Sequence, residues 1–229
     1  MIITIDGPTA SGKSSVAQKL AKDLNFYCLS SGYLYRALAY ILLNFYGYSK
    51  ETLEHLNADD IRDALDPQKF QYCLDQTNCG KVIYGNQDIT PFLKSDLVSQ
   101  GASIIAANKD VRDALNLMQR ECIKQRDVVV EGRDSGSVVF DAAEIKFYLT
   151  AALAERARRL QELQKSYGNA ITLKDAEAQI EERDTRDQER DIAPLTIPKN
   201  AYVVDNSNLT LDQTVSTMLN HVKQVEQQD

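Results

Sequence analysis

Short apolar runs alternate with longer amphipathic segments along most of the chain. The short runs predict strands; they lie at 2–5, 26–29, 128–130, 145–149 and 202–204. In the longer segments apolar residues recur every three or four positions, which predicts helices; these lie at 13–24, 35–45, 95–108, 110–125, 153–167, 172–190 and 210–225. Because strands alternate with helices, we expect an α/β fold in which helices cover both faces of a parallel sheet.

Two of the predicted helices carry a defined apolar face. In segment 35–45 this face comprises Leu38, Ile41, Leu42 and Phe45. Thr210, with Gln213 three residues later, forms a capping box that predicts the start of the last helix. The apolar face of that helix comprises Leu211, Val215, Met218, Leu219, Val222 and Val225.

Residues 66–95 depart from this alternation. Two short strand-like runs, 70–74 and 81–84, stand among turn-forming residues that include Asn78 and Gly85. This pattern predicts a small antiparallel insert. The chain shows no internal repeat and no low-complexity linker, so we expect a single domain over 1–229.

The charge balance limits the possible partners. The 229 residues include 26 Lys and Arg against 33 Asp and Glu, which gives a net charge of -7. This balance argues against a protein that binds nucleic acid or an anionic membrane through its overall field. Any anionic ligand must therefore be held by a local cluster of positive side chains.

Several other classes are not supported by the sequence. No apolar run reaches the ~18 residues that a membrane helix needs, and residues 1–6 do not resemble a signal peptide. The cysteines, at positions 28, 73, 79 and 122, include no C-x-x-C pair, and there are only two histidines. We therefore expect a cytoplasmic protein with reduced cysteines, without a zinc site and without histidine-based hydrolysis.

The strongest motif directly follows the first predicted strand. Residues 7–14 match G-x-x-x-x-G-K-[ST], in which backbone N–H groups and a helix N-terminus face phosphate oxygens. Lys13 is placed to reach the β- and γ-phosphates, and the Ser14 hydroxyl to ligate Mg²⁺. The predicted nucleotide-binding residues are Gly7, Pro8, Thr9, Ala10, Ser11, Gly12, Lys13, Ser14 and Ser15.

A phosphate loop identifies a superfamily and not a reaction. Guanine-binding GTPases need an N-K-x-D element, and the nearest string, residues 108–111, lacks the final Asp. A motor ATPase needs a longer chain. These observations favour a small-molecule kinase, in which arginines surround the transferred phosphoryl group.

Three arginine-containing clusters are candidates for that role. They are residues 31–36, residues 131–134 directly after an apolar strand, and residues 183–190 on a predicted helix. The strand-end cluster lies where ligands of parallel sheets bind. A solvated helix face remains an alternative for 183–190. Arg156, Arg158 and Arg159 either coat their helix or belong to a closing lid.

Taken together, these motifs resemble bacterial cytidylate kinases. The resemblance covers almost the whole chain, and its most specific parts are Gly-Arg-Asp at 132–134 followed by Val-Val-Phe at 138–140, and the run Arg-Asp-x-Arg-Asp at 183–187 before Ala-Pro-Leu at 193–195. It implies a nucleoside monophosphate kinase with a five-stranded parallel sheet. The implied parts are a core at 1–65, 96–154 and 191–229, a monophosphate-binding insert at about 66–95, and a helical lid at about 155–190.

The resemblance also implies a reaction, in which ATP with Mg²⁺ phosphorylates CMP or dCMP. Lys13, Arg133 and Arg190 would be catalytic. Carried over by matching motif, the CMP phosphate would be held by Ser31, Arg36, Arg133 and Arg190. The sugar would be held by Arg183 and Asp187, and the cytosine by Ser103, Arg112 and Asp134. A cytoplasmic monomer without nucleic-acid or membrane partners is expected.

The cytosine assignment is chemically consistent. A carboxylate accepts from the 4-amino group of cytosine, whereas uracil offers no donor there and would leave Asp134 unpaired. Sites built on such hydrogen bonds reject the analogue that lacks them, so we expect CMP to be preferred over UMP. The open alternatives are kinases for UMP, AMP or shikimate, and a regulatory P-loop protein.

The chain departs from the family pattern at a few positions. Ser30 and Glu131 each stand where the family usually has Asp, and Ser135 stands where it usually has Met. Ala142 follows Asp141 without the Pro that is usual nearby. Ser30 puts an acidic contact near the acceptor site in doubt. Glu131 keeps its charge and is expected to orient water on Mg²⁺. None of these changes removes a phosphate-binding arginine.

Overall fold

A five-stranded parallel sheet forms the centre of the molecule. The computed structural model describes residues 1–74 and 80–227. The strands follow the order β2-β6-β1-β7-β8, with bounds β1 Ile2–Asp6, β2 Tyr27–Ser30, β6 Val128–Gly132, β7 Ile145–Thr150 and β8 Tyr202–Asp205. All four neighbouring pairs are parallel, which confirms the predicted sheet.

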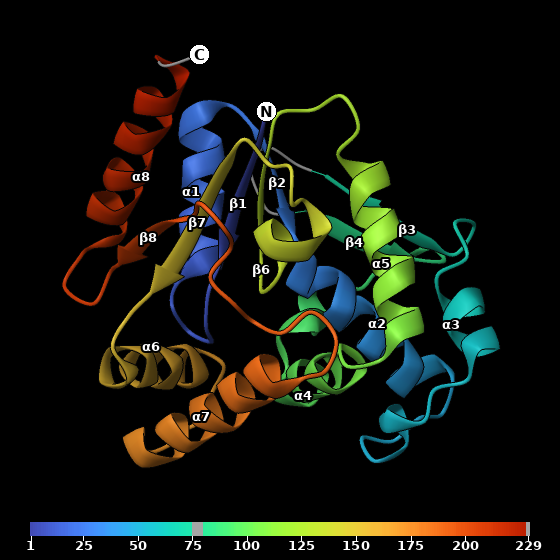
Figure 1. Cartoon of the computed structure of the whole chain (residues 1–229). Coiled ribbons are helices and arrows are strands. Elements are labelled where there is room, and N and C mark those ends of the chain that lie inside the picture. Colours follow the sequence, from blue (N-terminus) through green and yellow to red (C-terminus); the bar gives the residue numbers. More distant parts are fainter. Residues whose placement is uncertain (75–79, 228–229) are drawn as a thin grey trace.

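Helices cover both faces of this sheet (Figure 1). Their bounds are α1 Lys13–Leu24, α2 Ser31–Phe45, α3 Ala58–Ala64, α4 Asp96–Ile105, α5 Lys109–Cys122, α6 Leu153–Ser166, α7 Leu173–Glu189 and α8 Leu211–Glu226. Helices α1 and α8 pack against β1 and β7 through side chains such as Leu20, Phe147 and Met218. Helices α2, α4 and α5 share a second core.

The insert is antiparallel, as predicted. Its strands are β3 Phe70–Cys73, β4 Lys81–Tyr84 and β5 Gln87–Asp88. Phe70 and Val82 belong to the same hydrophobic cluster as α2, so the insert shares its core with the main body. Asn78 and Cys79 lie outside the described residues. The sequence pattern did not indicate α3 or β5, because these short, polar elements carry no periodic apolar signal.

Some details differ from what the sequence pattern suggests. Phe45 is 50% exposed and Leu211 is 43% exposed, because each lies at a helix end beyond the layer that its helix covers. Helix α2 begins directly after Ser30, four residues earlier than predicted. Cys28 is disulfide-bonded, which contradicts the expectation of reduced cysteines at that position; Cys73 and Cys122 are free.

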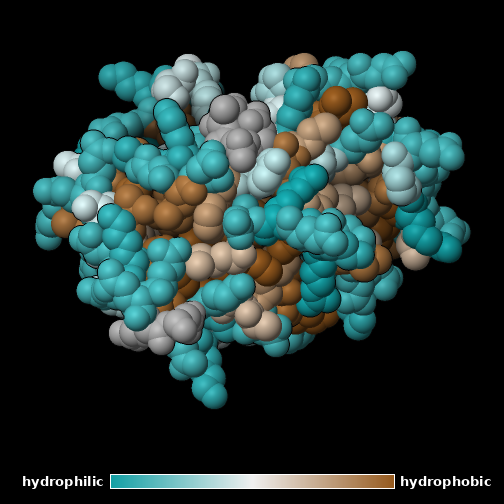
Figure 2. Space-filling model, turned by 90° about the horizontal axis from the view of Figure 1, so that it is seen from above, coloured by the Kyte–Doolittle hydropathy of each residue, from teal (hydrophilic) through white to brown (hydrophobic). Residues whose placement is uncertain are grey.

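The phosphate loop lies at the carboxyl ends of the strands, above α6 and α7 in Figure 1. Gly7 brings the loop against β7 so closely that a Cβ atom there would lie 2.0 Å from the Leu149 carbonyl oxygen. Glycine is therefore required where β1 passes into the loop. Figure 2 looks from above, away from α6 and α7, and shows hydrophilic side chains with hydrophobic surface between them. In the described part of the chain, no helix is both long and apolar enough to cross a membrane.

Helix α8 provides a test of the predicted capping box. The Thr210 side chain accepts from the backbone N–H of Gln213, and the Gln213 side chain accepts from that of Thr210 at 2.9 Å. We expect Thr210→Ala to lower the free energy of unfolding by about 1 kcal/mol, measured by urea denaturation. Thr217→Ala, inside the same helix, is the control and should change it by less than about 0.5 kcal/mol. Equal losses in the two variants would contradict a specific cap.

Candidate active site

Lys13 lies folded over the phosphate loop. Gly12 adopts a left-handed conformation, with φ of 93°, directly before α1. The Lys13 ammonium group donates to the carbonyl oxygen of Pro8 at 2.6 Å and to the Ser11 hydroxyl at 3.2 Å. Burial, together with the nearby Arg133, holds the pKa of Lys13 well below its usual range. A phosphate at the loop would give this buried charge a partner.

The carboxylate of Glu131 lies beside the first turn of α1. Ser14 donates to Glu131 Oε1 at 3.2 Å, and the Ser30 hydroxyl donates to the same oxygen. Ser31 donates to the backbone carbonyl of Glu131 at 3.0 Å. Glu131 is 4% exposed. The end of β6 is thereby joined to both the phosphate loop and the end of β2.

Two arginines of the cleft have guanidinium groups that the protein does not fully pair. The Nε atoms of Arg36 and Arg183 are buried and have no hydrogen-bond partner among the described residues. Burial lowers the pKa of both groups, and the neighbouring Arg133 lowers it further. Positive charge of this kind, buried without full compensation, favours an anionic ligand.

Arg133 and Asp187 form an ion pair beside these arginines. Arg133 Nε donates to Asp187 Oδ2 at 2.8 Å, and its Nη2 donates to the Thr9 hydroxyl at 3.4 Å. Burial raises the pKa of Asp187, but the charges of Arg133 and Arg183 outweigh it and hold that pKa below its usual value. Asp187 is therefore ionised and orients Arg133 toward the loop.

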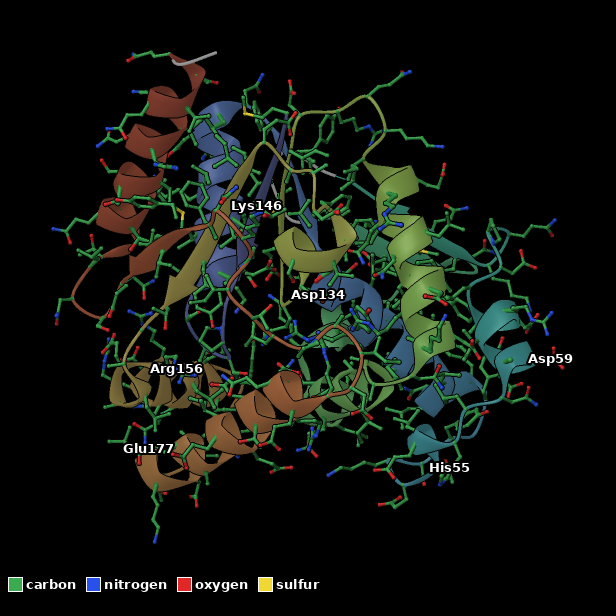
Figure 3. The ribbon with its side chains drawn as sticks, in the orientation of Figure 1. His55, Asp59, Asp134, Lys146, Arg156 and Glu177 are labelled. Carbon is green, nitrogen blue, oxygen red and sulfur yellow. The ribbon has the colours of Figure 1, made fainter. Side chains whose placement is uncertain are left out.

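A second ion pair of the cleft has a more deeply buried arginine than the Arg133–Asp187 pair. The Arg112 side chain is 2% exposed and binds Asp134, with its Nη1 donating to the Ala106 carbonyl at 3.2 Å. Arg190 Nη2 approaches the other Asp134 oxygen at 3.3 Å. Ser103 accepts from Arg186 at 3.1 Å. Figure 3 places Asp134 centrally, between the sheet and the helices below it.

One cavity of about 1160 Å³ brings these groups together. All nine predicted substrate-binding residues line it, as do Thr9, Ala10, Gly12, Lys13, Ser14 and Ser15 of the predicted loop set; Gly7, Pro8 and Ser11 do not. Arg190, predicted to hold phosphate, lies here against Asp134. The lining of the cavity thus combines residues of the phosphate loop, several arginines and the buried Arg112–Asp134 ion pair.

The model of the cytidylate kinase family matches residues 3–224 of this chain. The chain belongs to the cytidylate kinase family. It is 42% identical to a cytidylate kinase from Marinomonas sp., over 93% of this chain and 92% of the relative. It is 36% identical to one from Thermodesulfovibrio yellowstonii, over 96% and 97%. A solved structure from Eubacterium ventriosum, described as an uncharacterised protein, shares the fold with a TM-score of 0.54 at 12% identity, over 97% and 98%.

Two of the positions that depart from the cytidylate kinase pattern, Ser30 and Glu131, contact one another. Ser30 donates its hydroxyl proton to the Glu131 carboxylate, so one carboxylate and one hydroxyl stand where the family pattern has two acids. The Ser30 backbone N–H donates to the Tyr72 hydroxyl at 3.2 Å. No group of three or more His, Cys, Asp or Glu side chains suited to a metal occurs within residues 1–74 and 80–227.

The arginines of α6 make two kinds of contact. Arg156 pairs with Asp184 and donates to the Thr9 carbonyl at 3.1 Å; Arg159 donates to the Ser11 carbonyl at 3.2 Å. Arg158 is exposed and forms ion pairs with Glu155 and Glu162 of the same helix. Thus Arg156, labelled in Figure 3, and Arg159 contact the phosphate loop, whereas Arg158 coats the helix.

Asp6 is an important residue to which the sequence reasoning gave no role. This carboxylate is fully buried and accepts from the backbone N–H groups of Ser135 at 2.8 Å and Gly136 at 2.7 Å. Burial raises the pKa of Asp6 to about 6, against the opposing effect of these hydrogen bonds. It fixes the turn that carries Arg133 and Asp134. The available signal was its position at the end of a buried strand.

Arg36 allows the anion-binding interpretation to be tested. In wild-type protein, saturating inorganic phosphate should raise the melting temperature by about 5 °C. Arg36→Met should lose most of this increase without a lower melting temperature in phosphate-free buffer, because a buried charge without full compensation gives little stability.

The measurement is thermal unfolding at constant ionic strength, with chloride replacing phosphate as a reference. Arg62→Met is the matched control, because Arg62 forms an exposed ion pair with Asp59 on α3. A wild-type response to phosphate in Arg36→Met would contradict the assignment.

Proposed function

We propose that this protein transfers the γ-phosphoryl group of ATP to CMP or dCMP and forms the corresponding diphosphate. The observation that carries this proposal is one cavity that is lined both by the phosphate loop and by the buried Arg112–Asp134 pair. Membership of the cytidylate kinase family supports it. The proposed transfer is direct and in line. The acceptor phosphate is itself the nucleophile, so no general base is needed.

The acceptor would lie along the arginine-lined part of the cavity. We assign the CMP phosphate to Ser31, Arg36, Arg133 and Arg190, the sugar to Arg183 and Asp187, and the cytosine to Ser103, Arg112 and Asp134. The unpaired Nε atoms of Arg36 and Arg183 support this region as the polar end of the acceptor site. Arg133 and Arg190 would stabilise the charge that spreads over the transferring group.

The donor would bind at the phosphate loop. Lys13 would leave its contacts with Pro8 and Ser11 and bind the β- and γ-phosphate oxygens. Ser14 and Glu131 offer the hydroxyl and carboxylate oxygens that Mg²⁺ prefers, and they already contact one another at 3.2 Å. The cation would neutralise the charge of those phosphate oxygens.

Helices α6 and α7 would act as the lid. Their contacts with the loop carbonyls of Thr9 and Ser11 support movement of the lid together with the donor site. Closure would exclude water and suppress hydrolysis of ATP. We further propose that the protein acts as a cytoplasmic monomer. The net charge of -7 supports mononucleotides over long nucleic acids as ligands.

Acceptor selectivity is the direct test of the proposed reaction. ADP release should be fast with CMP or dCMP. With UMP, kcat/KM should fall by about 10²-fold or more, because Asp134 would lose its donor. Parallel coupled assays with CMP, dCMP, UMP and AMP measure this. Faster turnover of AMP or UMP would favour another monophosphate kinase, and ATP hydrolysis that needs no acceptor would favour a regulatory P-loop protein.

Lys13 tests the donor side. Lys13→Ala should lower kcat by about 10²- to 10³-fold, because a preorganised charge on the transferring phosphate is lost. Lys22→Ala on the same helix is the control, since Lys22 is exposed on α1 and lies outside the cavity. Steady-state kinetics with CMP provide the measurement. Normal turnover of Lys13→Ala would overturn the assigned donor site.

A further inference from the structure

Tyr35 is a buried residue of the cleft to which neither the motifs nor the proposed mechanism gives a role. It lies on α2, one residue before Arg36, and is 8% exposed. Its hydroxyl is buried and has no hydrogen-bond partner in the part of the chain that the structure describes. The residue lines the same cavity as Arg112 and Asp134.

The surroundings of Tyr35 place it at the base-binding end of the cavity. The guanidinium carbon of Arg112 lies 5.9 Å from the centroid of the Tyr35 ring. The charges of Arg112, Asp134, Arg190 and Asp113 act on its hydroxyl. Burial raises the pKa of Tyr35 to about 12, so the group is a neutral hydrogen-bond donor at physiological pH.

Among the described residues, the Tyr35 hydroxyl has no hydrogen-bond partner. Asp134 accepts from Arg112 through one oxygen and from Arg190 through the other, and not from Tyr35. Arginine side chains have no acceptor atoms. A buried hydroxyl without a partner costs free energy, and such a group lining a binding cavity is available to a ligand.

The hydrogen-bonding edge of cytosine has one donor and two acceptors. Asp134 would accept from the 4-amino group, and Arg112 would donate to N3 and to the 2-carbonyl oxygen. That oxygen has two lone pairs, so it can accept from a second donor as well. We propose that the Tyr35 hydroxyl donates a hydrogen bond to the 2-carbonyl oxygen of the pyrimidine base. This inference rests on the proposed function and adds a specificity-determining residue to it.

The assignment separates two kinds of selectivity. Cytosine and uracil share the 2-carbonyl group, so Tyr35 would favour both pyrimidines over adenine, which has no carbonyl. Asp134 would distinguish cytosine from uracil. Removal of the Tyr35 hydroxyl should therefore weaken CMP and UMP alike, without changing their ratio.

Tyr35→Phe removes only the hydroxyl group. We expect the Kd for CMP, measured by titration calorimetry, to rise by about 3- to 10-fold, which corresponds to one neutral hydrogen bond. The KM for ATP should stay unchanged. The melting temperature without ligand should not fall, because no hydrogen bond within the protein is lost. Tyr40→Phe is the matched control: Tyr40 lies on the same helix but stacks on Phe92 at 5.6 Å, outside the cavity.

A substrate analogue tests the atom that is contacted. In 2-thio-CMP the oxygen is replaced by sulfur, which is a weaker acceptor. Wild type should lose affinity for this analogue relative to CMP, whereas Tyr35→Phe should bind the two about equally. Additive losses from the variant and the analogue would show that the hydroxyl acts elsewhere, and would overturn the proposal.

The remaining outcomes are also decisive. An unchanged Kd for CMP in Tyr35→Phe, with or without a lower melting temperature, would mean that water or the protein satisfies the hydroxyl, and would overturn the contact alone. Wild-type turnover of CMP tests the proposed function independently. Its absence would overturn both proposals before any variant is compared.

Discussion

The cleft contains buried positive charge that the surrounding protein groups do not fully neutralise. Arg36, Arg133 and Arg183 lie close enough for each to disfavour the charge of a neighbour. Asp187 pairs with Arg133, but the Nε atoms of the other two stay without a partner. A bound phosphate would supply negative charge to this part of the cleft, although the chain as a whole carries a net charge of -7. The helices and strands that carry these arginines thus form a site whose charge an anionic ligand would balance.

Much of this arrangement could be predicted from the sequence because it depends on local patterns. Five short apolar runs correspond to the five strands of the sheet, and the spacing of residues 7–14 locates the phosphate loop. The pairing of particular side chains could not be predicted. Nothing in the local sequence of Arg190 indicates that it turns toward Asp134, or that Arg156 and Arg159 bind loop carbonyls while Arg158 remains outside. These contacts join residues far apart in the chain, and their partners are fixed by packing. The exposed Phe45 has the same cause, since helical periodicity does not show where a covering layer ends.

The two faces of the phosphate loop serve different parts of the molecule. Its carbonyl oxygens at Thr9 and Ser11 accept hydrogen bonds from Arg156 and Arg159 on α6. The Thr9 N–H donates to Asp184 on α7 at 2.8 Å. The Lys13 ammonium group donates a hydrogen bond to the Pro8 carbonyl oxygen. In the proposed donor complex, Lys13 would move toward the phosphates and the loop would adjust against these helices, so donor binding would be coupled to the position of α6 and α7.

Asp6 has a consequence for how the two substrates are aligned. The strand that ends at Asp6 continues directly into the donor loop, while the Asp6 carboxylate holds the turn that presents Arg133 and Asp134 to the acceptor. Asp6 also stands in register with Gly132 on the adjacent strand. The phosphate loop and the turn that carries Arg133 and Asp134 are thus both attached at the end of β1. In the proposed reaction, the backbone of the sheet would set the spacing between donor and acceptor. Asp134 at the end of β6 would then read the base together with Ser103 on α4 and Arg112 on α5.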